Sequence, residues 1–233
     1  MVHLGRFMSS TCVGGRVASS DAPLRCAVFL SGSGTGMDAL VSAQQRHHLP
    51  HQTVVVVANR PDVEGVARAE RLGLPVEVVE RVQDGRRLTR EEHEAAVLRR
   101  LENHDVEFIV LAGYMRLLSS TFLTPWSGRV INIHPSLLPH FPGAHAHRDV
   151  LASGTTLSGC TVHLVDEGMD TGAVIAQRTT PVFHDDDEAA LSARVKVEEH
   201  RLYPDVLTLI AEGRVHLKEN GVEVRDAQDL RVC

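Results

Sequence analysis

The sequence predicts an α/β protein built on a doubly wound, mostly parallel sheet, with an antiparallel strand pair in its C-terminal half. Three observations support this fold class. Short, continuous apolar runs recur in the first half of the chain, as expected for strands buried on both faces of a sheet. Stretches of helical character separate these runs, so strand and helix alternate. After a Pro/Gly-rich turn, two further runs follow each other closely, which is typical of an antiparallel pair.

Four strands are predicted for the parallel part of the sheet. Each is an uncharged run dominated by apolar residues, at 26–30, 53–58, 108–112 and 130–133. Their continuous rather than alternating pattern favours strands covered by helices on both sides. The connections between them should therefore be right-handed crossovers.

Three helices are predicted between these strands, at residues 37–46, 63–72 and 90–103. The third has the clearest start, because Thr89 can cap it and the following Glu91 and Glu92 suit the positive end of the helix dipole. This alternation completes the doubly wound pattern.

The C-terminal half has a different pattern. Residues 161–165 and 173–177 are predicted as strands joined by an Asp/Gly turn, which favours antiparallel pairing. Beyond them the sequence predicts a helix at 188–203 and a second, shorter helix at 206–212. No internal repeat or long linker interrupts the chain.

The two ends of the chain are predicted to lie outside the main domain. Residues 1–24 mix Gly, Ser, Arg and His without the apolar core of a secretory signal, so we expect a disordered or weakly ordered extension. The domain should span residues 25–215. The tail at 216–233 alternates valines with charged residues, which favours an added edge strand.

Composition narrows the choice of partners. The formal charge of −6 provides no basic surface for nucleic acid or for an anionic membrane, which favours a small-molecule partner. No apolar run approaches the roughly 18 residues of a membrane span. The four cysteines are scattered and form no Cys-x-x-Cys pair, so we expect neither a disulfide framework nor a thiolate zinc site, and a reducing cytoplasm fits.

The glycine-rich segment Ser31-Gly-Ser-Gly-Thr-Gly36 follows the first predicted strand and opens the first helix. Free backbone N–H groups and the helix dipole make such a junction suitable for a phosphate. The second strand ends in Asn59-Arg60 rather than in the acidic residue that binds the ribose of NAD. A phosphate monoester therefore fits better than a dinucleotide, although NADP bound by Arg60 and a simple tight turn both stay open.

Asn132 and His134 are the strongest candidates for catalysis. They lie two residues apart at the end of a predicted strand, so alternation places both side chains on one face. An amide donor and a titratable imidazole can then act on the same reacting atom. The alternative is a strand that runs into a loop, with His134 capping the turn.

Two other patterns near this turn have weaker functional interpretations. His145 and His147 could offer two imidazoles to a metal, but no Asp or Cys lies at the usual ligand spacing, so no metal is expected. Asp170-Thr-Gly172 resembles half of an aspartic-protease site, which needs two carboxylates. Asp170 matters only if its carboxylate reaches His134.

Several segments together resemble the phosphoribosylglycinamide formyltransferase family. They are the glycine-rich segment, Leu111-Ala-Gly-Tyr-Met-Arg-Leu-Leu118, Asn132-Ile-His-Pro-Ser-Leu-Leu-Pro139 followed by Phe141-Pro-Gly-Ala-His145, and Asp166-Glu-Gly-Met-Asp170. The resemblance extends from Cys26 to about Val215. It implies a Rossmann-like formyltransferase fold and transfer of a formyl group from 10-formyltetrahydrofolate to the amine of glycinamide ribonucleotide, a step of purine synthesis in one-carbon metabolism.

The resemblance also implies roles for individual residues. Asn132, His134 and Asp170 correspond to the catalytic trio. The N-terminal half would bind the ribonucleotide phosphate through Gly34, Thr35 and Gly36. The last helix would add Lys196, Val197, Glu198 and Glu199 to this site. The C-terminal half would complete the folate cleft, whose set is Arg90, Met115, Arg116, Leu117, Leu118, Val165, Asp166, Glu167, Gly168 and Met169.

These residues suggest a mechanism. The amine attacks the formyl carbon directly, Asn132 and a protonated His134 stabilise the oxyanion, and Asp170 raises the pKa of His134 and assists proton movement. Similar proteins usually carry Asn where this chain has Gly36, and often at Ser33, so two amide side chains are absent from the phosphate loop.

Three alternatives stay open. A 10-formyltetrahydrofolate hydrolase would use the same trio, and a non-catalytic ligand-binding module would share the fold. A metal-dependent hydrolase would use the histidines around the Pro/Gly turn, which are His134, His140, His145, His147 and His163. The sequence leaves both a monomer and a homodimer open.

Overall fold

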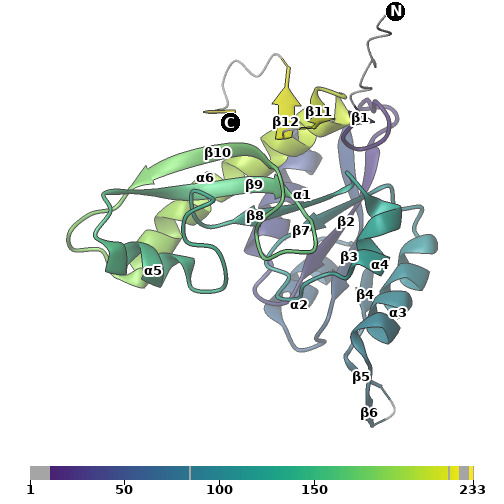
Figure 1. The fold of residues 1–233 in the computed structure, drawn as a ribbon. Helices are drawn as coiled ribbons and strands as arrows, with labels where there is room; N and C mark the ends of the chain where they lie inside the picture. Colours follow the sequence, from purple (N-terminus) through teal and green to yellow (C-terminus); the bar gives the residue numbers. More distant parts are fainter. Residues whose placement is uncertain (1–10, 84, 220, 226–230, 233) are drawn as a thin grey trace, which may run out of the picture.

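The computed structural model describes residues 11–83, 85–219, 221–225 and 231–232. Their main feature is an eight-stranded mixed sheet (Figure 1) with the strand order β13-β10-β9-β8-β7-β2-β3-β4. Neighbouring strands from β8 to β4 are parallel, and β9, β10 and β13 extend the sheet by antiparallel pairing. The strands are β2 (Leu24–Leu30), β3 (His51–Ala58), β4 (Val76–Val78), β7 (Phe108–Leu111), β8 (Val130–His134), β9 (Leu157–Leu164), β10 (Val174–Pro181) and β13 (Arg231–Val232).

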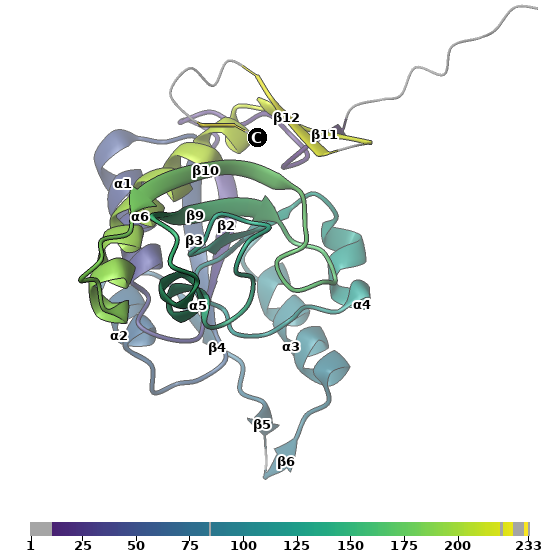
Figure 2. The same ribbon diagram turned by 60° about the vertical axis from the view of Figure 1, so that its left-hand side comes forward.

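Helices cover both faces of the parallel part, as Figure 2 shows for α1 and α2 on one side and α3 and α4 on the other. Along β2, Val28 and Leu30 pack into one apolar core, and Ala27 and Phe29 pack into a second core on the opposite face. The predicted doubly wound, mostly parallel sheet with an antiparallel C-terminal pair is therefore confirmed. The helices are α1 (Thr35–His47), α2 (Glu64–Arg71), α3 (Arg90–Glu102), α4 (Ser120–Leu123), the 3-10 turn η1 (Thr124–Trp126), α5 (Ala146–Ser153) and α6 (Glu188–Ala211).

The elements predicted for the parallel half are confirmed, with ends that shift by no more than two residues. Thr89 caps α3 as expected: its hydroxyl accepts a hydrogen bond from the Glu92 amide at 3.1 Å, and the Glu92 carboxylate accepts one from the Thr89 amide at 2.8 Å. This reciprocal capping box satisfies two otherwise free donors. The elements not predicted from the sequence include the short strand β4, the hairpin of β5 (Val82–Gln83) and β6 (Arg86–Arg87), the helices α4 and α5, and the 3-10 turn η1.

The prediction of two separate C-terminal helices was wrong, because α6 runs without a break from Glu188 to Ala211 with Pro204 inside it. Proline lacks an N–H and usually interrupts a helix. Here Leu202 and Val206, on either side of Pro204, are completely buried against the sheet. Burial of the surrounding apolar face stabilises the continuous helix against the loss of one backbone hydrogen bond.

The expectation that residues 1–24 lie outside the fold was wrong for residues 11–23, while residues 1–10 lie outside the described part of the chain. β1 (Thr11–Cys12) pairs with β11 (Val215–Lys218), which pairs with β12 (Gly221–Val224) in a small antiparallel sheet. Val13 is buried in the core, and Arg16 donates two hydrogen bonds to the Glu107 carboxylate, at 2.5 and 2.7 Å.

The predicted edge strand of the tail takes two forms. Val222 and Val224 lie in β12, which belongs to the small sheet, whereas β13 pairs with β10 at the edge of the main sheet. Residues 220, 226–230 and 233 of the predicted tail lie outside the described residues.

No helix in the described part of the chain combines the length and the apolar character that a membrane crossing requires.

Candidate active site

A cleft of about 530 Å³ opens at the carboxyl ends of the parallel strands β2, β7 and β8. The chain leaves β2 toward β3 and β4 and later returns to its other side through β7, so β2 and β7 flank a topological switch point. Ligands of open α/β sheets bind at such points because the loops on either side diverge. The loop that joins β9 to β10 and one face of α6 complete the walls.

The structure brings Asn132, His134 and Asp170 together in this cleft. Asn132 and His134 project from the same side of β8, and Asp170 comes from the loop between β9 and β10. The Asp170 carboxylate lies 3.3 Å from Nδ1 of His134 and 3.5 Å from the amide nitrogen of Asn132. It also accepts a hydrogen bond from the Gly143 amide at 2.8 Å. The Pro/Gly turn thus holds the carboxylate against the imidazole.

The hydrogen bonds of His134 determine its tautomer. Nε2 lies 2.9 Å from the carbonyl oxygen of Phe141, and a carbonyl can only accept, so Nε2 carries a proton. Nδ1 then faces the Asp170 carboxylate and attracts it strongly only when it is protonated as well. The Ser136 hydroxyl donates to the carbonyl oxygens of His140 at 2.6 Å and of Phe141 at 3.1 Å, which fixes the turn.

Burial has the largest effect on the pKa of His134. It lowers the pKa of the imidazole, and the hydrogen bond to Phe141 and the charge of Asp170 act in the opposite direction without cancelling this effect. Asp170 thus acts on the pKa of His134 in the expected direction, but burial has the larger effect and leaves that pKa below its ordinary value. Burial also acts to raise the pKa of Asp170, but the contact with His163, the hydrogen bond from Gly143 and the charge of His134 outweigh it, so that pKa is lowered.

His163 was expected only as one of the histidines near the Pro/Gly turn, and its place beside Asn132 was not predicted from the sequence. It lies on β9 directly opposite Asn132 on β8. Its Nδ1 donates to the Leu164 carbonyl at 2.8 Å, so Nε2 can accept a hydrogen bond from the Asn132 amide at 3.2 Å. Nε2 also lies 3.6 Å from the Asp170 carboxylate. His163 therefore orients the amide of Asn132, and only cross-strand register could have revealed this contact.

The glycine-rich segment forms the wall at the start of α1. Gly34 has φ of 71°, and a Cβ there would lie 2.6 Å from the backbone of Gly65, so only glycine fits. At Gly36 an added Cβ would meet only Ala112, at 3.8 Å, which leaves room for a larger side chain. Gly34, Thr35 and Gly36 all line the cleft.

Helix α6 contributes only part of the predicted stretch. Lys196 and Glu199 line the cleft, whereas Val197 is 47 % exposed and Glu198 forms ion pairs with Arg178 and Arg201 on the protein surface. Residues three or four positions apart share a helix face, so a continuous stretch cannot point into one site. Burial raises the pKa of Glu199 to about 7, against the effect of nearby Lys196.

Most of the predicted folate residues line the opposite wall. Residues 115–118 and the predicted residues 165, 166, 168 and 169 all do so, but Glu167 does not. Met115 and Met169 are 74 % and 53 % exposed at the mouth, whereas Leu118 is buried. This wall offers apolar surface to a flat ligand.

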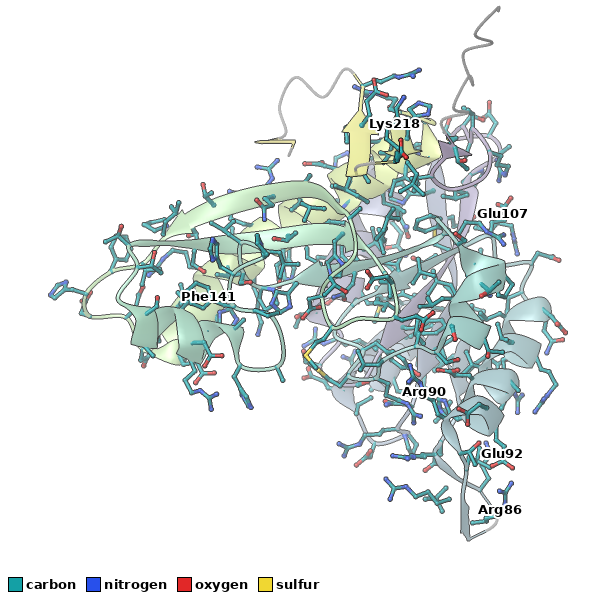
Figure 3. All side chains as sticks on the ribbon, in the orientation of Figure 1. Arg86, Arg90, Glu92, Glu107, Phe141 and Lys218 are labelled. Carbon is teal, nitrogen blue, oxygen red and sulfur yellow. The ribbon has the colours of Figure 1, made fainter. Side chains whose placement is uncertain are left out.

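Arg90 lies outside the cleft, in an adjoining pocket of about 490 Å³ that shares Arg116 and Leu117 with it. Figure 3 shows Arg90 at the start of α3, above Glu92 and Arg86. The Arg90 guanidinium donates to the Glu94 carboxylate at 3.2 Å.

Across the described ranges, no three His, Cys, Asp or Glu side chains are grouped so that they could hold a metal ion.

Comparison with known proteins extends these observations. Residues 24–207 match the formyl transferase family. The trifunctional purine biosynthetic protein adenosine-3 of Gallus gallus is 46% identical over 198 residues, which are 85% of this chain and 19% of that protein. The chain thus spans about a fifth of the length of that relative.

Two single-function relatives match over nearly their whole length. The phosphoribosylglycinamide formyltransferase of Escherichia coli is 35% identical over 195 residues, which are 83% of this chain and 90% of the relative. The crystal structure of glycinamide ribonucleotide transformylase 1 from Symbiobacterium toebii superposes with a TM-score of 0.82 at 38% identity, covering 87% of this chain and 94% of the other.

Proposed function

The chain belongs to the formyl transferase family and is a transferase enzyme, and we propose that it transfers the formyl group of 10-formyltetrahydrofolate to the amine of glycinamide ribonucleotide. This reaction places it in purine synthesis. The free thiols of Cys12, Cys26 and Cys160 suit the reducing cytoplasm in which we place the enzyme. A single domain would carry both substrates, with residues 25–215 as its expected extent and residues 11–23 packed against it.

The two walls of the cleft support this pair of substrates. Gly34, Thr35 and Gly36 at the start of α1 would bind the ribonucleotide phosphate through backbone N–H groups, joined by the charge of Lys196. Of the predicted stretch on α6, Lys196 and Glu199 remain in this role. The apolar wall formed by residues 115–118 and the loop that contains Met169 would take the pterin.

The reacting groups would meet between these walls. The amine attacks the formyl carbon, a bond forms between them, and the bond to the folate nitrogen breaks as the proton moves to that nitrogen. Negative charge grows on the formyl oxygen during attack. Asn132 and His134 would stabilise it, since a pre-aimed donor in a dry cleft contributes about 3 to 4 kcal/mol.

The negative charge on the formyl oxygen would also change the protonation of His134. Burial lowers the pKa of His134, but an oxyanion beside the ring would favour the charged imidazole. Asp170, 3.3 Å from Nδ1, would then stabilise the imidazolium and help a water carry the proton from the amine. Asn132 can donate to the oxyanion if the N–H that faces Asp170 at 3.5 Å turns to the substrate. Its other N–H would stay hydrogen-bonded to His163.

One observation carries the proposal: the Asp170 carboxylate, from the loop between β9 and β10, lies within 3.5 Å of both the His134 imidazole and the Asn132 amide of β8, at the switch point of the sheet. The main alternative is a hydrolase that releases formate from the same donor with the same trio. Lys196 and the glycine-rich wall favour transfer, because a hydrolase needs no second phosphate-bearing substrate.

The test follows loss of the formyl donor with and without glycinamide ribonucleotide. Loss that depends on the ribonucleotide supports transfer. Loss without it supports the hydrolase, and no loss supports a binding module. Retention of activity with a chelator present separates this mechanism from that of a metal-dependent hydrolase.

A further inference from the structure

Two exposed methionines lie at the mouth of the cleft. Met115, in the loop after β7, is 74 % exposed, and Met169, in the loop between β9 and β10, is 53 % exposed. Both line the cleft. Methionine is more often buried, as Met37 of α1 is in this chain. The two cleft methionines therefore present their thioethers both to solvent and to a ligand in the cleft.

The surroundings of the two methionines differ. The Met115 amide donates a hydrogen bond to the Ser31 hydroxyl at 3.0 Å, which ties the loop after β7 to the glycine-rich segment. An added Cβ at Gly143 would lie 3.2 Å from the Met169 sulfur, so this sulfur packs against the Pro/Gly turn. The Gly143 amide in turn donates to the Asp170 carboxylate. Met115 thus lies on the wall proposed for the pterin, whereas Met169 also packs against the turn that holds Asp170.

Thiols do not compete for an oxidant inside the cleft. Among the described residues that line it, none is a cysteine. Cys26 and Cys160 are buried, and burial raises the pKa of both thiols. Burial also raises the pKa of Cys12, which lies in β1. The thiolate is the reactive form of cysteine, so all three should react slowly. A thioether carries no proton and needs no ionisation.

An exposed thioether can be oxidised by a peroxide. A lone pair of the sulfur attacks one oxygen of hydrogen peroxide, so that an S–O bond forms and the O–O bond breaks. The other oxygen leaves as hydroxide, which takes up the remaining proton to become water. The sulfur loses two electrons and the peroxide gains them. The product, methionine sulfoxide, is polar, and sulfoxide reductases convert it back to methionine.

Oxidation would change the wall proposed for the pterin. A thioether makes a favourable contact with an aromatic ring, and a sulfoxide introduces a polar oxygen where that ring would pack. We propose that Met115 and Met169 are a pair of reversible oxidation sites, through which a peroxide weakens binding of the formyl-folate donor. This inference rests on the proposed function.

The two sites should differ in their kinetic effect. Loss of one sulfur–aromatic contact corresponds to a KM for the formyl donor about two- to tenfold higher. We expect this change, with little change in kcat, from oxidation of Met115. A sulfoxide at Met169 would also crowd the turn beside Gly143. Because the Gly143 amide positions Asp170, oxidation of Met169 should lower kcat as well.

The experiment treats the full chain with hydrogen peroxide, removes the peroxide with catalase, and measures KM, kcat and the oxidised peptides by mass spectrometry. The wild type is compared with Met115→Leu, Met169→Leu and the double variant, each against its own untreated sample. Leucine is close to methionine in volume and cannot be oxidised in this way.

We expect Met115 and Met169 to gain oxygen before the buried Met37, and KM of the wild type to rise in step with this gain. The double variant should show no such rise. Methionine sulfoxide reductases should restore the original KM of the wild type. Cys12→Ser is the matched control, because it removes an oxidisable sulfur outside the cleft, and it should stay as sensitive to peroxide as the wild type.

An unchanged KM after both cleft methionines have been oxidised, or an equal rise of KM in the double variant, would overturn the inference. Oxidation of Met37 before Met115 and Met169 would also overturn it. If the untreated enzyme turns over no donor, the proposed function fails instead. Calorimetric binding of folic acid before and after oxidation then tests the two methionines independently of catalysis, and an affinity that does not fall would contradict their role.

Discussion

At the scale of single residues, the active-site imidazole is balanced between burial and charge. Burial lowers the pKa of His134, and the Asp170 carboxylate at 3.3 Å opposes this effect. The ring can therefore start neutral and become charged only when an anion develops beside it. Interactions that strengthen in the transition state raise kcat more than they improve substrate binding.

Replacing Asp170 with Asn tests this balance. An amide oxygen at the same place can still accept the hydrogen bond from Gly143, so the loop should keep its shape. The negative charge next to His134 is lost, however, and the imidazolium becomes harder to form. We expect kcat to fall on the order of 10²-fold or more with little change in KM, as measured by steady-state kinetics. A rise in KM alone would make Asp170 a binding residue.

Only part of this site is predictable from the sequence. Alternation along one strand placed Asn132 and His134 on the same face, because that periodicity is a local property. The approach of Asp170 and the contact from His163 depend on how β8, β9 and the following loop pair, which a single sequence does not encode locally. The resemblance to known proteins supplied Asp170, and nothing in it supplied His163.

At the scale of elements, a buried histidine joins β3 to two helices. His51 is 1% exposed; its Nδ1 accepts from the Gln44 side chain of α1 at 2.9 Å, and its Nε2 donates to the Thr208 hydroxyl of α6 at 3.1 Å. The Thr208 hydroxyl in turn donates a hydrogen bond to the Pro204 carbonyl oxygen at 2.9 Å. Only the neutral ring suits both neighbours, because a proton on Nδ1 would face the Gln44 donor.

This junction should make stability depend on pH. Burial lowers the pKa of His51 from 6.5 to about 4, so below pH 6.5 the unfolded chain binds a proton that the folded chain resists. The stabilisation is present above pH 6.5 and is lost as the pH falls toward 4, by about 2 kcal/mol at pH 5. Denaturant unfolding of the wild type and of His51→Gln at pH 7.5 and pH 5 measures it. The difference in the free energy of unfolding between the wild type and the variant should be smaller at pH 5 than at pH 7.5 by that amount. An equal difference at both pH values would contradict the prediction.

Elements whose sequence signal is strong and local were predictable, and those that depend on tertiary burial were not. The apolar runs of β2 and β3 and the capping box of α3 are local features of the sequence. For this reason the predicted ends of these elements lie within two residues of the observed ends. The three residues of β4 are too few to show a period, and they become a strand only because β3 offers a free edge. The helix was predicted to end before Pro204 because the sequence alone does not show that Pro204 is buried within α6.

At the scale of the whole molecule, the described N-terminal segment connects distant parts of the chain. β1 pairs with β11, Val13 is buried in the core, and the Ala18 amide donates to the Ala211 carbonyl at 2.7 Å. Arg16 contacts Glu107 through two nitrogens and donates to the carbonyl oxygens of residues 22 and 23. The segment thus fastens the small sheet and the end of α6 to the start of β7, far from the cleft.

Removing residues 1–23 should therefore lower stability without changing the chemistry. The truncated chain loses the burial of Val13, which contributes about 1.5 to 3 kcal/mol to the free energy of unfolding. It also loses the bidentate but partly exposed ion pair of Arg16 with Glu107, which contributes up to about 1 kcal/mol. For a chain of this length, that corresponds to a Tm lower by about 5 to 15 °C in calorimetry. Arg16→Gln in the full chain should lower Tm by a smaller amount, and the exposed-site control Arg99→Gln should leave it unchanged. Because the residues proposed for catalysis all lie C-terminal to the cut, kcat at low temperature should match that of the full chain. An unchanged Tm would instead show that the stable fold begins at residue 25, as the sequence had suggested.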